Sequence, residues 1–155
     1  MTDKSYKVKL DRISFELGMI NCFVEMVACG VKKMAISPPL PPEDYAQVAP
    51  FSEKIVRGFG IKSYLEKSLL VTDLQTEDFT AGKWAILYYT DDAALDAYHN
   101  LKKKKQGIEE AGTSDKKNRK EISREFMRLL SYPDDIIDKK LEQETPESPF
   151  LLIDE

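Results

Sequence analysis

The chain is poor in the residues on which most catalytic and metal sites depend. Its 155 residues include one histidine, His99, and two cysteines, Cys22 and Cys29. No Cys-x-x-Cys, Gly-x-Ser-x-Gly or dinucleotide-binding glycine motif occurs. A di-iron carboxylate bundle needs two Glu-x-x-His units, which a single histidine cannot supply. The sequence therefore favours a protein that is not an enzyme, and it indicates no catalytic residue, no metal and no cofactor.

The two cysteines are too few and too far apart to form a disulfide framework. They lie seven residues apart in an apolar stretch, which on a helix would separate their Cα atoms by about 10.5 Å. A disulfide requires Cα atoms within about 7 Å. We therefore expect free thiols, as in a reducing cytoplasm. The apolar neighbours predict that both thiols are buried and inert.

No apolar run is long enough for a membrane span or a secretory signal. The most apolar stretch, residues 13–31, is interrupted by Glu16, Asn21 and Glu25. A signal core is an uninterrupted run of about 7–15 residues, and central charges are costly in a bilayer. The sequence predicts a cytoplasmic protein without a membrane partner.

The charge balance makes nucleic acid an unlikely ligand. The chain has 23 basic and 27 acidic residues, a formal net charge of −4, whereas nucleic-acid-binding domains are usually basic. The one basic segment, residues 102–120, has eight basic and three acidic residues and contains no aromatic residue for base stacking. It is typical of a solvated helix end, although it could also meet an anionic ligand or an acidic chain segment.

Apolar residues near the N-terminus predict a long helix over residues 10–36. The first seam has 3–4 spacing and consists of Leu10, Ile13, Leu17, Ile20, Val24, Val27, Val31 and Met34. A second seam, nearly opposite, consists of Phe15, Met19, Cys22, Met26, Cys29 and Ile36. A helix that is apolar on two sides is central in a bundle or buried between subunits. We therefore expect a homo-oligomer, with a dimer favoured.

Prolines divide this helix from the next. Four of the residues Pro38–Pro42 are proline, which cannot continue a helix. Pro42 suits the first position of a second helix over residues 43–71, which Gly58-Phe59-Gly60 is expected to kink or split. The same segment fits the PxxP pattern of a docking peptide, which makes it a possible contact for a protein partner.

The stretch from residue 77 to 106 is open to two interpretations. Residues 84–89 are an apolar run that fits either a buried helix or a strand. We favour the helix, with Asp91–Asp92 as a cap in either case. The resulting fold is all-α, an antiparallel bundle of four to five helices. The alternative is α+β, with a short strand or hairpin around residues 69–73 and 83–89.

The remaining chain is expected to close the bundle. Ser114 or Asp115 begins a fourth helix and Pro133 opens a fifth. We predict a single domain over residues 1–144 and a proline-containing tail over residues 145–155. The apolar segment Phe150–Ile153 of this tail is a second possible docking peptide.

A ligand pocket inside the bundle is the main alternative to a purely structural interior. Aromatic residues with one buried acid or histidine could line it, and the candidates are Glu16, Trp84, Tyr88, Tyr98 and His99. The plainer interpretation of Glu16 is an ion pair with Arg12, four residues earlier, at the rim of the bundle. The predicted function is a self-associating helical interaction or ligand-binding protein. The alternative is an enzyme or small-molecule-binding protein with this pocket.

Overall fold

The computed structural model describes residues 9–75 and 77–143. The predicted domain boundary after residue 144, the tail over residues 145–155 and its Phe150–Ile153 segment lie outside the described residues. No helix in the described part of the chain is both long and apolar enough to cross a membrane.

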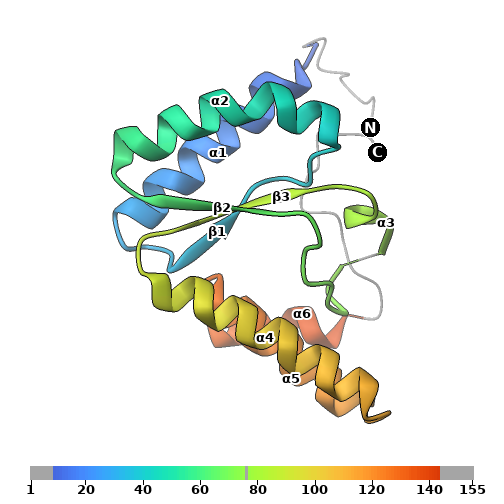
Figure 1. The fold of residues 1–155 in the computed structure, drawn as a ribbon. Coiled ribbons are helices and arrows are strands. Elements are labelled where there is room, and N and C mark those ends of the chain that lie inside the picture. The colour runs from blue at the N-terminus through green and yellow to red at the C-terminus, as the bar shows by residue number, and fades with distance from the viewer. Residues whose placement is uncertain (1–8, 76, 144–155) are drawn as a thin grey trace, which may run out of the picture.

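Helices cover both faces of a small antiparallel sheet (Figure 1). Along the chain the elements are α1 (Arg12–Ala28), β1 (Met34–Ile36), α2 (Pro42–Phe59), β2 (Lys62–Glu66), α3 (Glu77–Thr80), β3 (Ala85–Tyr89), α4 (Asp92–Glu110), α5 (Lys116–Leu129) and α6 (Asp134–Glu142). The strand order is β1-β3-β2, so β3 is central. One layer contains α1 and α2, and the opposite layer contains α4, α5 and α6.

The predominance of helix is confirmed, but the all-α bundle is not, because β3 is a strand. All five of its residues are buried. Ile86 and Tyr88 belong to the core beneath α1 and α2, whereas Leu87 and Tyr89 belong to the core above α4 and α5. A strand buried on both faces has no polar alternation, so periodicity cannot distinguish it from a buried helix. The α+β alternative describes the fold better, although the neighbouring strand is β2 rather than residues 69–73.

The first helix is shorter than the predicted rod. It ends at Ala28, and Gly30 adopts a left-handed conformation (φ +78°) that turns the chain towards β1. The middle of the first seam is buried at Ile20, Val24 and Val27, whereas Leu10 is 43% exposed and Val31 is 67% exposed. The second seam does not form one face, because Ile36 lies in β1. The prediction of buried thiols is wrong, since Cys22 and Cys29 are both exposed. Burial of this seam against a second copy stays a prediction.

Local signals at helix starts are confirmed. Pro42 is the first residue of α2, and Asp91 and Asp115 cap α4 and α5 through their side chains. The second helix nevertheless ends at Phe59, because Gly60 (φ +71°) reverses the chain into β2.

The proline segment is packed into the fold. Leu40 is fully buried and exchanges two backbone hydrogen bonds with Trp84, of 2.8 and 2.7 Å. Docking of the Pro38–Pro42 segment on a partner stays a prediction, and it would require these contacts to open.

Candidate functional site

The five residues predicted for an interior pocket lie in different places. Glu16 and Tyr88 are buried on the α1–α2 side of the sheet, and Trp84 precedes β3. Tyr98 and His99 lie on α4, on the opposite side of the sheet. Among the five, a direct contact is seen between Tyr98 and His99, which are adjacent in the sequence, and ligand binding at all five stays a prediction.

Glu16 is buried, not at a rim, and its expected partner binds elsewhere. The Glu16 side chain is 3% exposed and its Oε2 atom has no hydrogen-bond partner in the described part of the chain. Arg12 instead contacts buried Asp44, with 2.6 Å between Nη2 and Oδ2. Burial, followed by repulsion from Asp44, raises the pKa of Glu16 to about 7, against the opposing attraction of Arg12 and Lys83.

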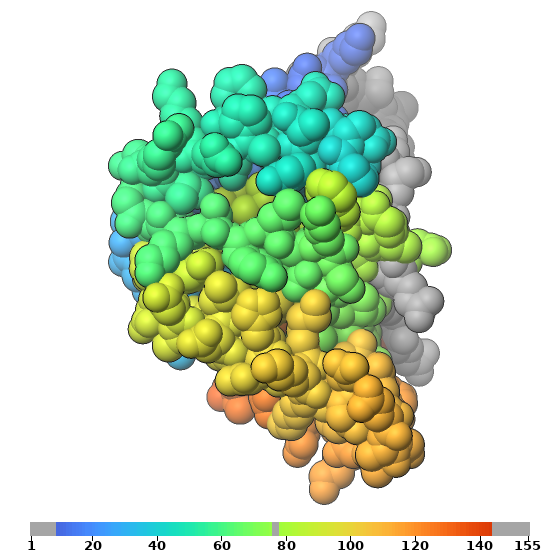
Figure 2. Space-filling model, in the orientation of Figure 1, coloured from blue at the N-terminus to red at the C-terminus, as the bar shows by residue number. Residues whose placement is uncertain are grey.

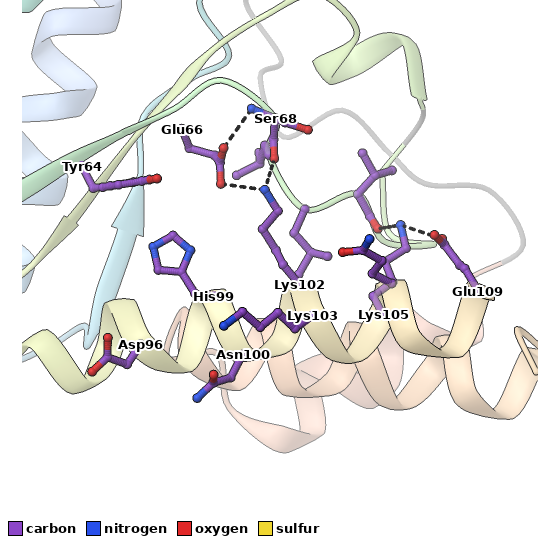
Figure 3. A pocket seen from close by; sticks show the side chains of 14 residues that line it. Tyr64, Glu66, Ser68, Asp96, His99, Asn100, Lys102, Lys103, Lys105 and Glu109 are labelled. Atoms are coloured by element: carbon purple, nitrogen blue, oxygen red, sulfur yellow. Dashed lines mark hydrogen bonds and ion pairs between the residues drawn. The ribbon is translucent and has the colours of Figure 1, made fainter. Parts of the chain in front are cut away.

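The candidate functional site is an open groove on the other side of the sheet, between β2 and α4. It has a volume of about 820 Å³. One wall consists of Tyr64, Glu66 and residues 68–71, and the other consists of α4 residues between Asp96 and Glu109 (Figure 3). Figure 2 shows this face, with the segment after α2 at the surface between α2 and α4.

Glu66 organises the wall of this groove. Its Oε1 atom accepts a hydrogen bond from the Ser68 backbone N–H (2.9 Å), and its Oε2 atom accepts from the Tyr98 hydroxyl (2.9 Å) and from Lys102 Nζ (3.0 Å). Burial acts to raise the pKa of Glu66, but these three donors outweigh it and hold the pKa below its ordinary value. The groove therefore contains a buried acid that stays ionised.

Further hydrogen bonds attach α4 to the segment after β2. The Tyr98 hydroxyl accepts from Leu70 N–H at 3.0 Å, and burial together with the nearby Glu66 carboxylate raises the pKa of this tyrosine. Lys102 Nζ also donates to Ser68 O at 2.7 Å, and Lys105 Nζ donates to Val71 O at 2.7 Å. These cross-links fix the two walls relative to each other, so the groove is preformed.

His99 lies in this groove between two aromatic rings. Its ring centroid is 5.1 Å from that of Tyr64 and 5.6 Å from that of Tyr98, both in edge arrangements. Lys103 follows one turn later on the same helix face, and Figure 3 shows its side chain extending back towards His99. The groove thus offers an imidazole and an ammonium beside each other.

The outer edge of β2, the strand beside the groove, pairs with no other strand in the described part of the chain. Ser37 N–H donates to Ile86 O, and Leu40 exchanges backbone hydrogen bonds with Trp84. The backbone N–H and C=O groups of the even-numbered residues around β3 therefore point towards β1. Backbone N–H and C=O groups alternate in direction along a strand, so those of the odd-numbered residues of β3 point towards β2. There Leu87 pairs with Tyr64, and the backbone groups of Tyr64 therefore point towards β3. The N–H and C=O groups of Ser63 and Leu65 consequently point outward from the sheet.

A second groove of about 770 Å³ adjoins the first at Val71, Lys105 and Glu109. It includes the start of α5, and therefore part of the basic segment over residues 102–120. The Arg119 guanidinium there is paired with Asp73 at 3.2 Å. Among the described residues, no group of three or more histidine, cysteine or acidic side chains is arranged to hold a metal ion.

Of the residues at this groove, the sequence singled out His99 and Tyr98 as candidates, and it did not single out Glu66 or Lys103. Glu66 meets Tyr98 and Lys102 across separations of 32 and 36 residues, which leave no local pattern. The available signal was an acid inside an apolar stretch, Leu65-Glu66 before Leu69-Leu70, where a buried charge needs partners.

Comparison with known proteins gives no match. No protein-family model fits the chain, and neither a curated protein nor a solved structure matches it.

Proposed function

We propose that this protein is an interaction module that binds an extended segment of a partner protein along β2, in the groove between β2 and α4. The observation that carries the proposal is the position of an unpaired strand edge directly beside an open groove. A bound strand gains affinity from main-chain hydrogen bonds to such an edge, and it gains specificity from pockets for alternate side chains.

The dimensions of the site suit a short extended segment. The groove follows α4 from Asp96 to Glu109, a length of roughly 20 Å at 1.5 Å per helical residue. Six residues of an extended chain cover about the same length at 3.3 Å each. The outward N–H and C=O groups of Ser63 and Leu65 would bond to the middle of such a segment.

The contacts of His99 favour binding over catalysis. Those in the described part of the chain are edge contacts with Tyr64 and Tyr98 rather than hydrogen bonds. A catalytic histidine is normally held by an orienting group and lies within reach of a nucleophile. Aromatic surfaces beside a strand edge are more useful for gripping side chains of a bound peptide.

The proposal is tested by selecting peptides from a random heptapeptide phage library on the immobilised protein. The variant Ser63→Pro removes an outward N–H without removing a hydrogen bond of the sheet, and Ser63→Val is its matched control. Selected peptides should bind the wild type and Ser63→Val alike, and bind Ser63→Pro at least tenfold more weakly. Peptides that bind all three proteins equally would contradict the proposal.

Self-association is a second candidate function, because the same outer edge of β2 could pair with the β2 edge of a second copy. Antiparallel pairing of two β2 strands about Tyr64 would join the outward backbone groups of Ser63 in each copy to those of Leu65 in the other. Light scattering at micromolar concentration should then give a mass above the 17.7 kDa of one chain. The variant Ser63→Pro should reduce that mass to one chain, and a monomeric wild type would exclude this candidate.

A further inference from the structure

We infer that the segment bound in the groove carries an acidic side chain, aspartate or glutamate, which Lys103 and His99 of α4 recognise. This inference rests on the proposed function, since it describes what the groove selects. It also requires that the Lys103 ammonium is free to bind a ligand.

The charges that line the groove are largely paired with one another. Lys102 is held by Glu66 and by Ser68 O. Lys105 donates to Val71 O, and its Nζ atom lies 3.6 Å from a carboxylate oxygen of Glu109. Within the described residues, Lys103 has neither a hydrogen bond nor an ion pair, so a bound carboxylate would not have to displace an existing partner.

Helix geometry joins Lys103 to the other polar groups of this wall. Positions 99 and 103 are neighbours on one helix face, and Asn100 lies beside them in the groove. The lysine points back along the helix towards the histidine in Figure 3. An ammonium, an imidazole N–H and an amide N–H are all donors, and hydrogen bonds from charged donors to a carboxylate are the strongest of this kind.

One acid, Asp96, opposes this assignment and limits where the partner's carboxylate can lie. It lines the same groove, one turn before His99, and it has no ion pair in the described part of the chain. In Figure 3 its carboxylate points away from both His99 and Lys103. The partner's acid is therefore expected on the Lys103 side of His99, and Asp96→Asn should strengthen its binding about twofold by removing repulsion.

The strand register explains why one acidic position can be selective. Side chains of an extended segment alternate between the two faces of the sheet. Tyr64 and Glu66 face α4, because they pair with Leu87 and Ala85, which belong to the core on that side. Every second side chain of the bound segment would thus face α4, and the one nearest Lys103 is the position where we expect the acid.

The test repeats the heptapeptide selection on three further proteins: Lys103→Glu, Lys117→Glu and His99→Asn. Lys117 is exposed on α5 and does not line the groove, so its substitution matches the charge change of Lys103→Glu. On the wild type and on Lys117→Glu, acidic residues should be enriched at one fixed position of the selected peptides. On Lys103→Glu, that position should become lysine or arginine.

Binding of one selected peptide and its Glu→Gln form then gives the size of the effect by fluorescence anisotropy. We expect the affinity for the acidic peptide to fall about fivefold in Lys103→Glu and about threefold in His99→Asn. The affinity for the Glu→Gln peptide should not fall in either variant. Enrichment without an acidic position, or equal binding to Lys103→Glu, overturns this inference alone. Failure to select any Ser63-dependent peptide overturns the proposed function, and the inference falls with it.

Discussion

The pKa of a buried glutamate is shifted in opposite directions on the two faces of the sheet. Glu16, under α1 and α2, is 3% exposed, and Glu66, above α4, is 6% exposed. The pKa of Glu16 rises to about 7, whereas the pKa of Glu66 is lowered. Both acids are desolvated, but only Glu66 receives three hydrogen bonds. Burial alone therefore does not set the charge of an acid, since the number of donors around it decides the result.

This difference separates the roles that the two faces can have. On the α4 side, donors from the segment after β2 and from α4 meet on Glu66, so that β2, that segment and α4 are connected. On the α1–α2 side, Glu16 keeps one buried oxygen without a hydrogen bond in the described residues, and Arg12 pairs with Asp44 instead of with Glu16. The α4 side is thus rigid where the groove lies, and the α1–α2 side is sensitive to protons.

The largest effect is expected from removing the satisfied acid. The variant Glu66→Leu would strand the Tyr98 hydroxyl, the Lys102 ammonium and the Ser68 N–H, and it should lower the free energy of unfolding by about 3 kcal/mol. Urea denaturation at pH 7 measures this loss. Exposed Glu109 serves as the control, and Glu109→Leu should change stability by less than about 0.5 kcal/mol. A loss below about 1 kcal/mol for Glu66→Leu would mean that the network does not hold the groove.

The second effect has the opposite sign and depends on pH. Because the pKa of Glu16 is raised to about 7, the folded protein keeps a proton that the unfolded chain has already lost. Between about pH 4.5 and 7 the free energy of unfolding should therefore fall as pH rises, by up to about 1.4 kcal/mol per pH unit from this group.

The variant Glu16→Gln removes that titration and should stabilise the fold by about 2 kcal/mol at pH 8, with little change at pH 5. Urea denaturation at both pH values provides the comparison. Glu25 is exposed on the same helix, and Glu25→Gln should not alter the pH dependence. An unchanged slope in Glu16→Gln would show that Glu16 has an ordinary pKa.

A smaller loss is expected at the hydroxyl that bridges the groove walls. Removing it in Tyr98→Phe leaves Leu70 N–H without its acceptor and Glu66 with one donor fewer. The cost should be about 1.5 kcal/mol. The pKa of Glu66 should also rise, which a carboxyl ¹³C NMR titration of the variant would measure. An unchanged pKa of Glu66 would show that the Tyr98 hydroxyl does not contribute to its ionisation.

The smallest effect should come from the matching tyrosine on the other face. Within residues 9–75 and 77–143, the Tyr88 hydroxyl has one hydrogen-bond partner, the Ser52 hydroxyl at 2.8 Å. Tyr88→Phe should cost less than about 1 kcal/mol, since only one hydroxyl is left unpaired. Thermal denaturation of both tyrosine variants in parallel checks the order. A larger loss for Tyr88→Phe than for Tyr98→Phe would reverse the comparison between the faces.

The parts of the fold that could be predicted depend on local chemistry. Pro42, Asp91 and Asp115 each mark the start of a helix, because capping and proline geometry involve only a few neighbouring residues. The ends of α1 and α2 depend on the left-handed conformations of Gly30 and Gly60. A glycine permits that conformation but does not require it, so the end of α1 was not evident from the sequence, and Gly58-Phe59-Gly60 indicated only a kink or split in the second helix.

The sheet and the groove depend on contacts between distant residues. Burial on both faces hides the period of β3, so the strand remained an alternative to a helix. His99 drew attention as the only histidine, but the Glu66 network joins residues more than 30 positions apart. Cys22 is exposed because only a narrow set of α1 residues, at Glu16, Ile20, Val24 and Val27, is buried. The apolar composition of the helix did not show which residues these are.

Amide hydrogen exchange along β2 tests the central claim most directly. In the free protein, Tyr64 N–H, which is bonded to β3, should exchange slowly, whereas the outward N–H groups of Ser63 and Leu65 should exchange fast. Saturation with a selected heptapeptide should slow Ser63 and Leu65 at least tenfold and leave Tyr64 unchanged. Fast exchange of Ser63 and Leu65 in the saturated complex would contradict the account, as would slow exchange of both in the free protein.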